Sequence, residues 1–121
     1  MNRGTAAALT LLLAGCSKPS PSQQASEQAK QVAQEAGLEC AIGAEAAWSG
    51  ECGLERDGAS LTIRHPDGGF RRFRILSDGR GVEAADGSEK AQLQIVDQGR
   101  VEIRIGGDRY RMPVRIAGAG Q

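Results

Sequence analysis

The stretch that decides the fold of this chain is DRYRMPVRI, residues 108–116. Its even positions are Tyr110, Met112, Val114 and Ile116, and the residues between them are arginine or proline. An alternation with a period of two places the apolar side chains together, because successive side chains of a strand point to opposite faces. The stretch therefore predicts a strand over 108–116 with one buried face.

Four further segments alternate in the same way, and short turn sequences separate them. The apolar positions are Leu61 and Ile63, Phe73 and Ile75, Leu93 and Ile95, and Val101, Ile103 and Ile105. The turn sequences contain Asp or Gly, which tolerate a positive φ, and occur at 57–58, 66–69, 78–79, 86–87, 97–99 and 106–107. This pattern predicts a mainly β fold, a small antiparallel meander closed into a barrel or folded into a two-layer sandwich.

A short helix is predicted ahead of the strands. Residues 26–36, SEQAKQVAQEA, are good helix formers, with Ser26 as a candidate N-cap and Gly37 as a stop signal. The preceding residues, 17–25, are polar, contain prolines and show no apolar periodicity. Such a composition predicts a disordered, flexible tether.

The N-terminal run Leu13-Ala14-Gly15-Cys16 closes an apolar stretch that begins near Ala6 and follows the positive charge of Arg3. This arrangement resembles the lipobox signal peptide of bacterial lipoproteins. The apolar stretch is too short to span a bilayer as a helix. The resemblance implies cleavage before Cys16 and attachment of acyl chains such as palmitate to it. A plain signal peptide and a buried N-terminal helix are the alternatives.

In the Gram-negative lipoproteins that this signal resembles, the residue after the lipidated cysteine influences sorting. Ser17 stands there, in place of the Asp that usually keeps such proteins at the inner membrane. The resemblance therefore implies a protein of the outer membrane, facing the periplasm and contacting the membrane through its lipid anchor. The expected organisation is a signal peptide over 1–15, lipidated Cys16 and a tether over 16–25, a helix over 26–37, a β-domain over 38–117 and a disordered tail over 118–121.

The cysteine count fits an exported protein. The chain has three cysteines, so a lipid on Cys16 leaves Cys40 and Cys52 as a pair. A disulfide closing a loop of this length stabilises a small domain by about 3 kcal/mol. A metal pair and two buried thiols are the alternatives. Because His65 is the only histidine and no Cys-x-x-Cys spacing occurs, we expect no metal site and no cofactor.

Composition limits the chain to one small domain with a thin core. Aromatic residues make up 3% of the chain, which contains 17 glycines, so the core must be built from Leu, Ile and Val. The 15 Lys and Arg residues balance 15 Asp and Glu residues. A formal net charge of zero argues against nucleic acid as a partner.

His65 is the obvious candidate for catalysis, since Asp67 lies close enough in sequence to orient an imidazole. The favoured interpretation is structural, because Pro66-Asp67-Gly68-Gly69 is typical of a hairpin turn and places His65 at the end of a strand. No Gly-x-Ser-x-Gly motif occurs, and the cysteines are accounted for. We therefore expect no enzymatic activity, with an enzyme using His65 as a remote alternative.

Arginine is the one feature that points to a binding partner. Two predicted strands carry it at outward positions, Arg72 and Arg74 in one and Arg109 and Arg111 in the other. Together they would form a candidate anion-binding face for lipid phosphate, lipopolysaccharide or an acidic protein, since guanidinium groups bind such groups bidentately. The alternative is a solvated face on which arginines pair with carboxylates across strands, those of Glu55, Glu83, Glu102 and Asp108.

Three segments, 63–73, 78–82 and 106–111, resemble small uncharacterised bacterial envelope proteins, which implies an exported β-domain and no particular activity. In architecture the chain is also similar to the periplasmic lipoprotein inhibitors of C-type lysozyme, although the sequence motifs of those inhibitors are absent. We therefore expect a non-enzymatic interaction or structural module with an anionic envelope component or a periplasmic protein as partner. Inhibition of a lysozyme or another secreted hydrolase is the alternative.

Overall fold

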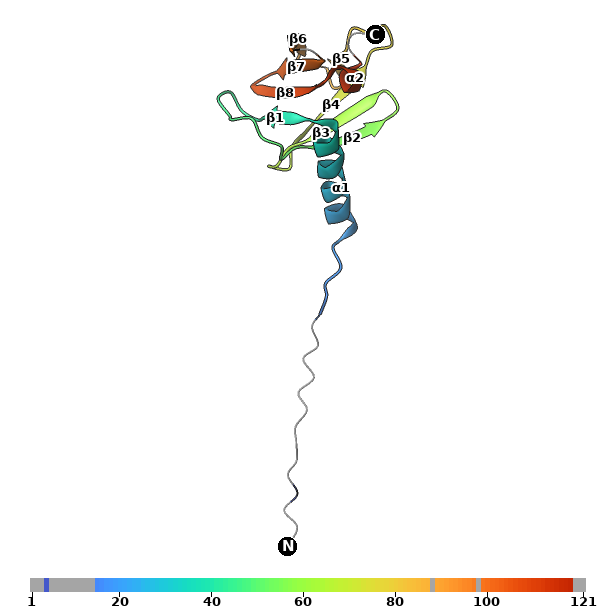
Figure 1. Ribbon diagram of the computed structural model, residues 1–121, viewed down its shortest axis with the longest axis vertical. Coiled ribbons are helices and arrows are strands. Elements are labelled where there is room, and N and C mark those ends of the chain that lie inside the picture. The colour runs from blue at the N-terminus through green and yellow to red at the C-terminus, as the bar shows by residue number, and fades with distance from the viewer. Residues whose placement is uncertain (1–3, 5–14, 88, 98, 119–121) are drawn as a thin grey trace.

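The computed structural model describes residues 4, 15–87, 89–97 and 99–118 of the chain. It is a small β-domain from which one helix projects (Figure 1). The elements are α1 (Pro21–Ala36), β1 (Glu39–Ala41), β2 (Gly53–Asp57), β3 (Ser60–Arg64), β4 (Phe70–Ile75), β5 (Val82–Ala84), β6 (Gln92–Asp97), β7 (Arg100–Ile105), β8 (Asp108–Pro113) and α2 (Val114–Ala117).

The strands form two antiparallel sheets of four, and the predicted mainly β class is confirmed. Sheet A has the order β1-β8-β7-β6 and sheet B the order β2-β3-β4-β5. Sheet B is a simple meander, whereas sheet A joins the first strand of the domain to the last one. The described strands thus make two layers and not a closed barrel, which decides between the two predicted architectures.

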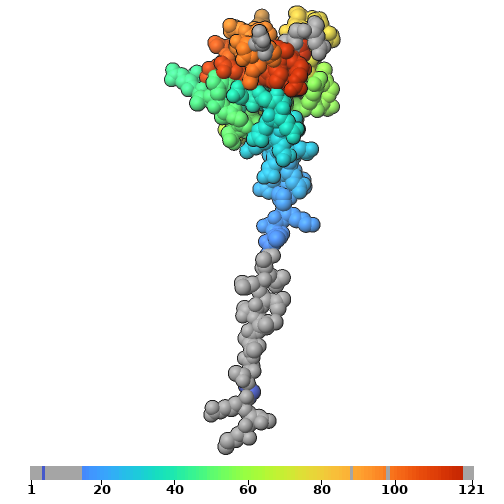
Figure 2. Space-filling model, in the orientation of Figure 1, coloured from blue at the N-terminus to red at the C-terminus, as the bar shows by residue number. Residues whose placement is uncertain are grey.

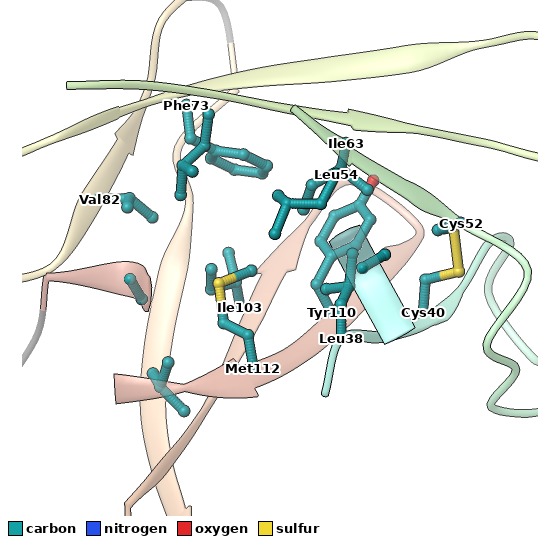
Figure 3. Close-up of a cluster of buried hydrophobic side chains, with 14 of the residues drawn as sticks. Leu38, Cys40, Cys52, Leu54, Ile63, Phe73, Val82, Ile103, Tyr110 and Met112 are labelled. Atoms are coloured by element: carbon teal, nitrogen blue, oxygen red, sulfur yellow. A yellow bond between two sulfur atoms is a disulfide. The ribbon is translucent and has the colours of Figure 1, made fainter. Parts of the chain in front are cut away.

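The core lies between the two sheets (Figure 3). Its fully buried members come from the alternating positions that the sequence predicted, Leu61, Ile63 and Phe73 from sheet B and Val101, Ile103, Tyr110 and Met112 from sheet A. The rings of Phe73 and Tyr110 meet edge to face with centroids 5.7 Å apart, a favoured geometry for aromatic pairs. One aromatic residue from each sheet therefore anchors an otherwise aliphatic core.

Helix α1 begins five residues before the predicted start at Ser26. Ser20 is the N-cap: its hydroxyl accepts from the Gln23 amide and the Gln23 side chain accepts from the Ser20 amide, a capping box, with Pro21 as the first helical residue. The tether predicted over 16–25 is therefore wrong for residues 21–25, which are helical. The predicted stop is confirmed, since Gly37 has φ 76° and ends the helix.

Helix α1 packs its C-terminal half on sheet B. Ala29 and Ala33 are buried, and the helix lies against β2 at Gly53. A β-carbon added to Gly53 would stand 2.9 Å from the β-carbon of Ala29, so only glycine allows this approach. The residues before Ala29 are exposed, and the first turns of the helix project away from the domain (Figures 1 and 2).

The strand predicted over 108–116 ends at Pro113, and the last residues of that stretch form the short helix α2. Pro113 lacks an N–H group and is found at the end of the strand, where no further ladder bond is required of it. The Val114 amide then donates to the Gly99 carbonyl at 2.8 Å, and Ala117 is buried in the core. The strand predicted over 114–116 was therefore wrong. An alternation of apolar and polar residues as short as this one does not distinguish a strand from one helical turn.

Candidate functional site

Cys16 precedes the first helix and all the strands in the sequence. Residues 15–20 are exposed and lead into α1, and Cys16 is a free, exposed cysteine. Most of the predicted signal peptide, residues 1–3 and 5–14, lies outside the described residues, as do residues 119–121 of the predicted tail. Over the described ranges, none of the helices has the length and apolar character that a membrane crossing needs.

Cys40 and Cys52 form the predicted disulfide. Cys40 belongs to β1 in sheet A, and Cys52 directly precedes β2 in sheet B. The bond therefore joins the two layers and closes the segment between them, residues 41–51. Both half-cystines are buried, with Cα atoms 6.3 Å apart (Figure 3).

The four candidate arginines do not share one face. Arg72 and Arg74 lie on β4 in sheet B, whereas Arg109 and Arg111 lie on β8 in sheet A. The residues between them, such as Phe73 and Tyr110, point into the common core. Because each sheet turns its other face outward, the two pairs lie on opposite sides of the domain, and the expectation of a single surface is wrong.

On sheet B the arginines are paired with carboxylates. Arg64 Nε donates to Glu55 Oε1 at 2.7 Å, and Arg74 Nη2 lies 2.6 Å from Glu83 Oε1. Arg72 instead lies over the exposed ring of Phe70, with its guanidinium carbon 5.4 Å from the centroid. Arg64 and Arg74 therefore follow the alternative in which cross-strand carboxylates satisfy the guanidinium groups, whereas Arg72 contacts an aromatic ring.

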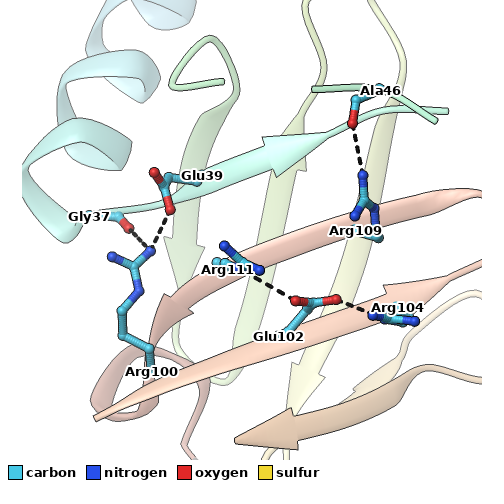
Figure 4. A network of polar contacts seen from close by, with 8 residues as sticks. All are labelled: Gly37, Glu39, Ala46, Arg100, Glu102, Arg104, Arg109 and Arg111. Atoms are coloured by element: carbon cyan, nitrogen blue, oxygen red, sulfur yellow. Dashed lines mark hydrogen bonds and ion pairs between the residues drawn. The ribbon is translucent and has the colours of Figure 1, made fainter. Parts of the chain in front are cut away.

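On sheet A a buried carboxylate organises the arginines (Figure 4). Glu102 lies on the outer face of β7 and is only 3% exposed. Arg104 Nε donates to one of its oxygens at 2.7 Å and Arg111 Nε to the other at 3.2 Å. Burial acts to raise the pKa of Glu102, but the two arginines outweigh burial and hold its pKa below the usual value.

Trp48 covers two arginines of this face. The guanidinium carbons of Arg109 and Arg111 lie 4.9 Å and 4.1 Å from the centre of its ring. Arg109 Nη2 also donates to the Ala46 carbonyl at 2.8 Å, which holds the disulfide-closed segment against β8. We call the outer surface of sheet A made by these side chains the basic face; its members are Trp48, Arg100, Glu102, Arg104, Arg109 and Arg111.

Trp48 was not among the predicted site residues. The available signal was that the chain has one tryptophan and that it lies between the two cysteines of the predicted disulfide. Its contact with Arg109 and Arg111 arises because β1 pairs with β8, with Ala41 opposite Arg109, and carries the following segment across the outer face of the sheet. This pairing joins residues far apart in the sequence.

His65 lies where the sequence predicted it, at the end of β3 in a turn closed by its amide and the Gly69 carbonyl. Its Nε2 is 2.7 Å from the hydroxyl oxygen of Tyr110, and Asp67 bonds the Gly69 amide. Burial lowers the pKa of His65 and raises that of Tyr110. The imidazole thus forms a hydrogen bond that connects the two sheets.

A second polar link joins the sheets beside His65. Arg71 Nε of β4 donates to Asp108 Oδ2 of β8 at 3.0 Å, and the other Asp108 oxygen accepts from the Gly43 amide at 3.0 Å. No group of three or more His, Cys, Asp and Glu side chains suited to a metal ion occurs among the described residues.

Comparisons with protein-family models, with curated proteins and with solved structures found no match for this chain. The basic face and the exposed Cys16 are therefore interpreted from their own chemistry.

Proposed function

We propose that this protein is a lipid-anchored module of the bacterial outer membrane, attached through Cys16 and facing the periplasm, that binds an anionic partner without catalysing a reaction. The single observation that supports a lipid anchor is the position of Cys16 in the structure. It is exposed, stands ahead of the first helix and takes no part in the disulfide. A lipid at this position would leave every described helix and strand undisturbed.

Helix α1 supports this assignment as a spacer. Its 16 residues correspond to about 24 Å at 1.5 Å per residue. Only its C-terminal half is packed against the domain, so the first turns extend toward Cys16 (Figure 2). A stalk of this kind would separate the β-domain from the lipid-bearing Cys16.

The basic face is the surface we assign to the partner. It carries four arginines, while Glu102 on β7 and Glu39 on β1 are the carboxylates that pair with them. Trp48 orders Arg109 and Arg111 by stacking, which reduces the entropy lost when a guanidinium group binds an anion. The surface therefore fits a phosphate or carboxylate group of an envelope component or an acidic protein.

The anchor is tested by metabolic labelling with radioactive palmitate and by membrane fractionation. The wild-type protein should be labelled and sediment with outer membranes. The lipoprotein resemblance implies two acyl chains on the Cys16 sulfur and one on its amine, and these exceed the two signals needed for stable attachment. Cys16→Ser should lose the label, while Cys40→Ser, which changes a cysteine outside the proposed anchor, should keep it. Release of unlabelled wild-type protein into the soluble periplasm would contradict the anchor.

The closed segment between the two cysteines favours one second candidate, inhibition of a lysozyme or another secreted hydrolase. This segment protrudes at one side of the domain (Figure 2) and is held by the disulfide and by the bond from Gly43 to Asp108. A protruding loop that is rigid before binding suits insertion into a cleft. Loss of lysozyme activity on adding the protein, relieved by Glu45→Lys at the loop turn, would support this candidate; unchanged lysozyme activity would count against it.

A further inference from the structure

The four edges of the two sheets differ in their protection against pairing with another chain. β1 and β5 are only three residues long, and β2 lies against α1 and carries Glu55 and Asp57. The remaining edge is β6, which is six residues long and has no described strand on its outer side. An edge of this length offers free backbone groups to a further strand.

β6 lacks the residues that usually block such pairing. From Gln92 to Val96 it has no charged residue and no proline, and its one charge, Asp97, comes at its end. Two of the four large apolar side chains exposed in the described part of the chain belong to β6, with Ile95 59% and Val96 37% exposed. Free backbone groups and exposed apolar side chains occur here together.

We propose that β6 pairs antiparallel with β6 of a second copy of this chain, centred on Leu93, so that sheet A continues through both molecules. Leu93 and Ile95 are alternate residues of β6 and lie on one face of the sheet, and Ala91, two residues before Leu93, packs against the core as Leu93 does. An antiparallel pair must match residues of one face. In this register Leu93 opposes its own counterpart and Ile95 opposes Ala91. Gln92 then opposes Gln94 on the other face.

Two charges of opposite sign, Lys90 shortly before β6 and Asp97 at its end, favour a copy of the same chain as the partner. Ile95 and Asp97 pair with successive residues of β7, so the β-bulge leaves Val96 out of the ladder. Asp97 therefore follows Ile95 directly along the ladder. Because Ile95 opposes Ala91 of the second copy, Asp97 opposes Lys90 of that copy, and the symmetry of the pair gives the same contact a second time. Both residues are exposed, and neither forms an ion pair with another described residue. A parallel copy would bring like charges together.

The pairing is compatible with two anchors in one membrane. β6 lies at the end of the domain away from the start of α1 (Figure 1), so the two α1 helices would point in opposite directions. The five residues 16–20 reach about 17 Å when extended, which allows both ends of a pair lying along the bilayer to reach it. This arrangement along the membrane rests on the proposed anchor, whereas the pairing of β6 does not.

The mass of the full chain, extracted in mild detergent and measured by analytical ultracentrifugation, tests the pairing. The wild-type protein should be a dimer, and Ile95→Lys should make it a monomer because it introduces a charge on the edge. Val32→Lys is the matched control, since Val32 is 40% exposed on α1 and should leave the dimer intact. Lys90→Glu should weaken the dimer, and adding Asp97→Lys to it should restore the dimer.

Cysteine crosslinking tests the register independently of any effect of Ile95→Lys on folding. A tagged Gln92→Cys chain mixed with an untagged Gln94→Cys chain should give a disulfide-linked dimer, because facing residues of an antiparallel pair lie within disulfide range. Each variant alone should crosslink much less, with the wild-type chain as the baseline for bonds through Cys16. A monomeric wild-type protein, an unchanged dimer of Ile95→Lys, or equal crosslinking of either variant alone would overturn the proposal.

Discussion

The Nε2 atom of His65 lies 2.7 Å from the hydroxyl oxygen of Tyr110, and this contact joins a turn of sheet B to the second strand of sheet A. Tyr110 is fully buried, so its hydroxyl group depends on this partner. A buried hydroxyl without a hydrogen bond costs about 1–3 kcal/mol. The contact therefore helps to hold the two layers in one relative position.

Stability should depend on pH through His65. Burial keeps its folded-state pKa below the unfolded value of 6.5, so protonation favours the unfolded chain. The free energy of unfolding should be highest above about pH 6.5 and decrease as the pH falls from there toward the folded-state pKa. Urea unfolding at about pH 7.5 and about pH 5.5 measures this, and since His65 is the only histidine, His65→Gln should flatten the dependence. An equally steep dependence in that variant would contradict the assignment.

Loss of the disulfide should loosen the connection between the sheets. Replacing Cys40 and Cys52 together by Ala should lower the free energy of unfolding by about 2–4 kcal/mol relative to the oxidised wild-type protein, measured by urea unfolding of both. Mass spectrometry of the denatured, unreduced wild-type protein after thiol labelling should find neither residue modified. Labelling at both positions would refute the bond.

Removal of the buried carboxylate of the basic face should cost more than removal of an exposed one. Glu102→Gln leaves Arg104 and Arg111 without the counter-charge that lies between them and should lower the free energy of unfolding by about 1–3 kcal/mol, a value reduced by the partial exposure of both arginines. The matched control is Glu55→Gln, whose exposed pair with Arg64 should contribute at most about 1 kcal/mol. Thermal or urea unfolding compares the two, and equal losses would show that burial of Glu102 has no energetic consequence.

Binding of an anionic partner should depend on sheet A and not on sheet B. Arg104→Gln should weaken co-sedimentation with vesicles that contain anionic lipid, and added salt should weaken binding of the wild-type protein. Arg74→Gln is matched to it, because the two arginine side chains are 57% and 61% exposed and each pairs with one glutamate. Since Trp48 is the only tryptophan, its fluorescence should report binding. Equal weakening by both substitutions would contradict the assignment to the basic face.

Several features of this protein could be predicted from short stretches of sequence. The alternation at Leu61 and Ile63 and at Val101 and Ile103 identified strands and their buried side, because a period of two is a property of the extended backbone itself. The cysteine count indicated the disulfide, and Gly37 the end of α1. The capping box of Ser20 and Gln23 also marks the start of α1 in the sequence, although Ser26 was the predicted N-cap.

Only the tertiary structure decided which strands share a sheet. Periodicity says which face of a strand is buried but not which other strand lies beside it, and so it did not separate Arg72 from Arg109 or bring Trp48 over Arg111. The pairing of β1 with β8 and the bond from His65 to Tyr110 join residues 45 or more positions apart in the sequence. Such contacts depend on the packing of the whole chain around one core, whereas strand periods, turns and caps depend on a few neighbouring residues.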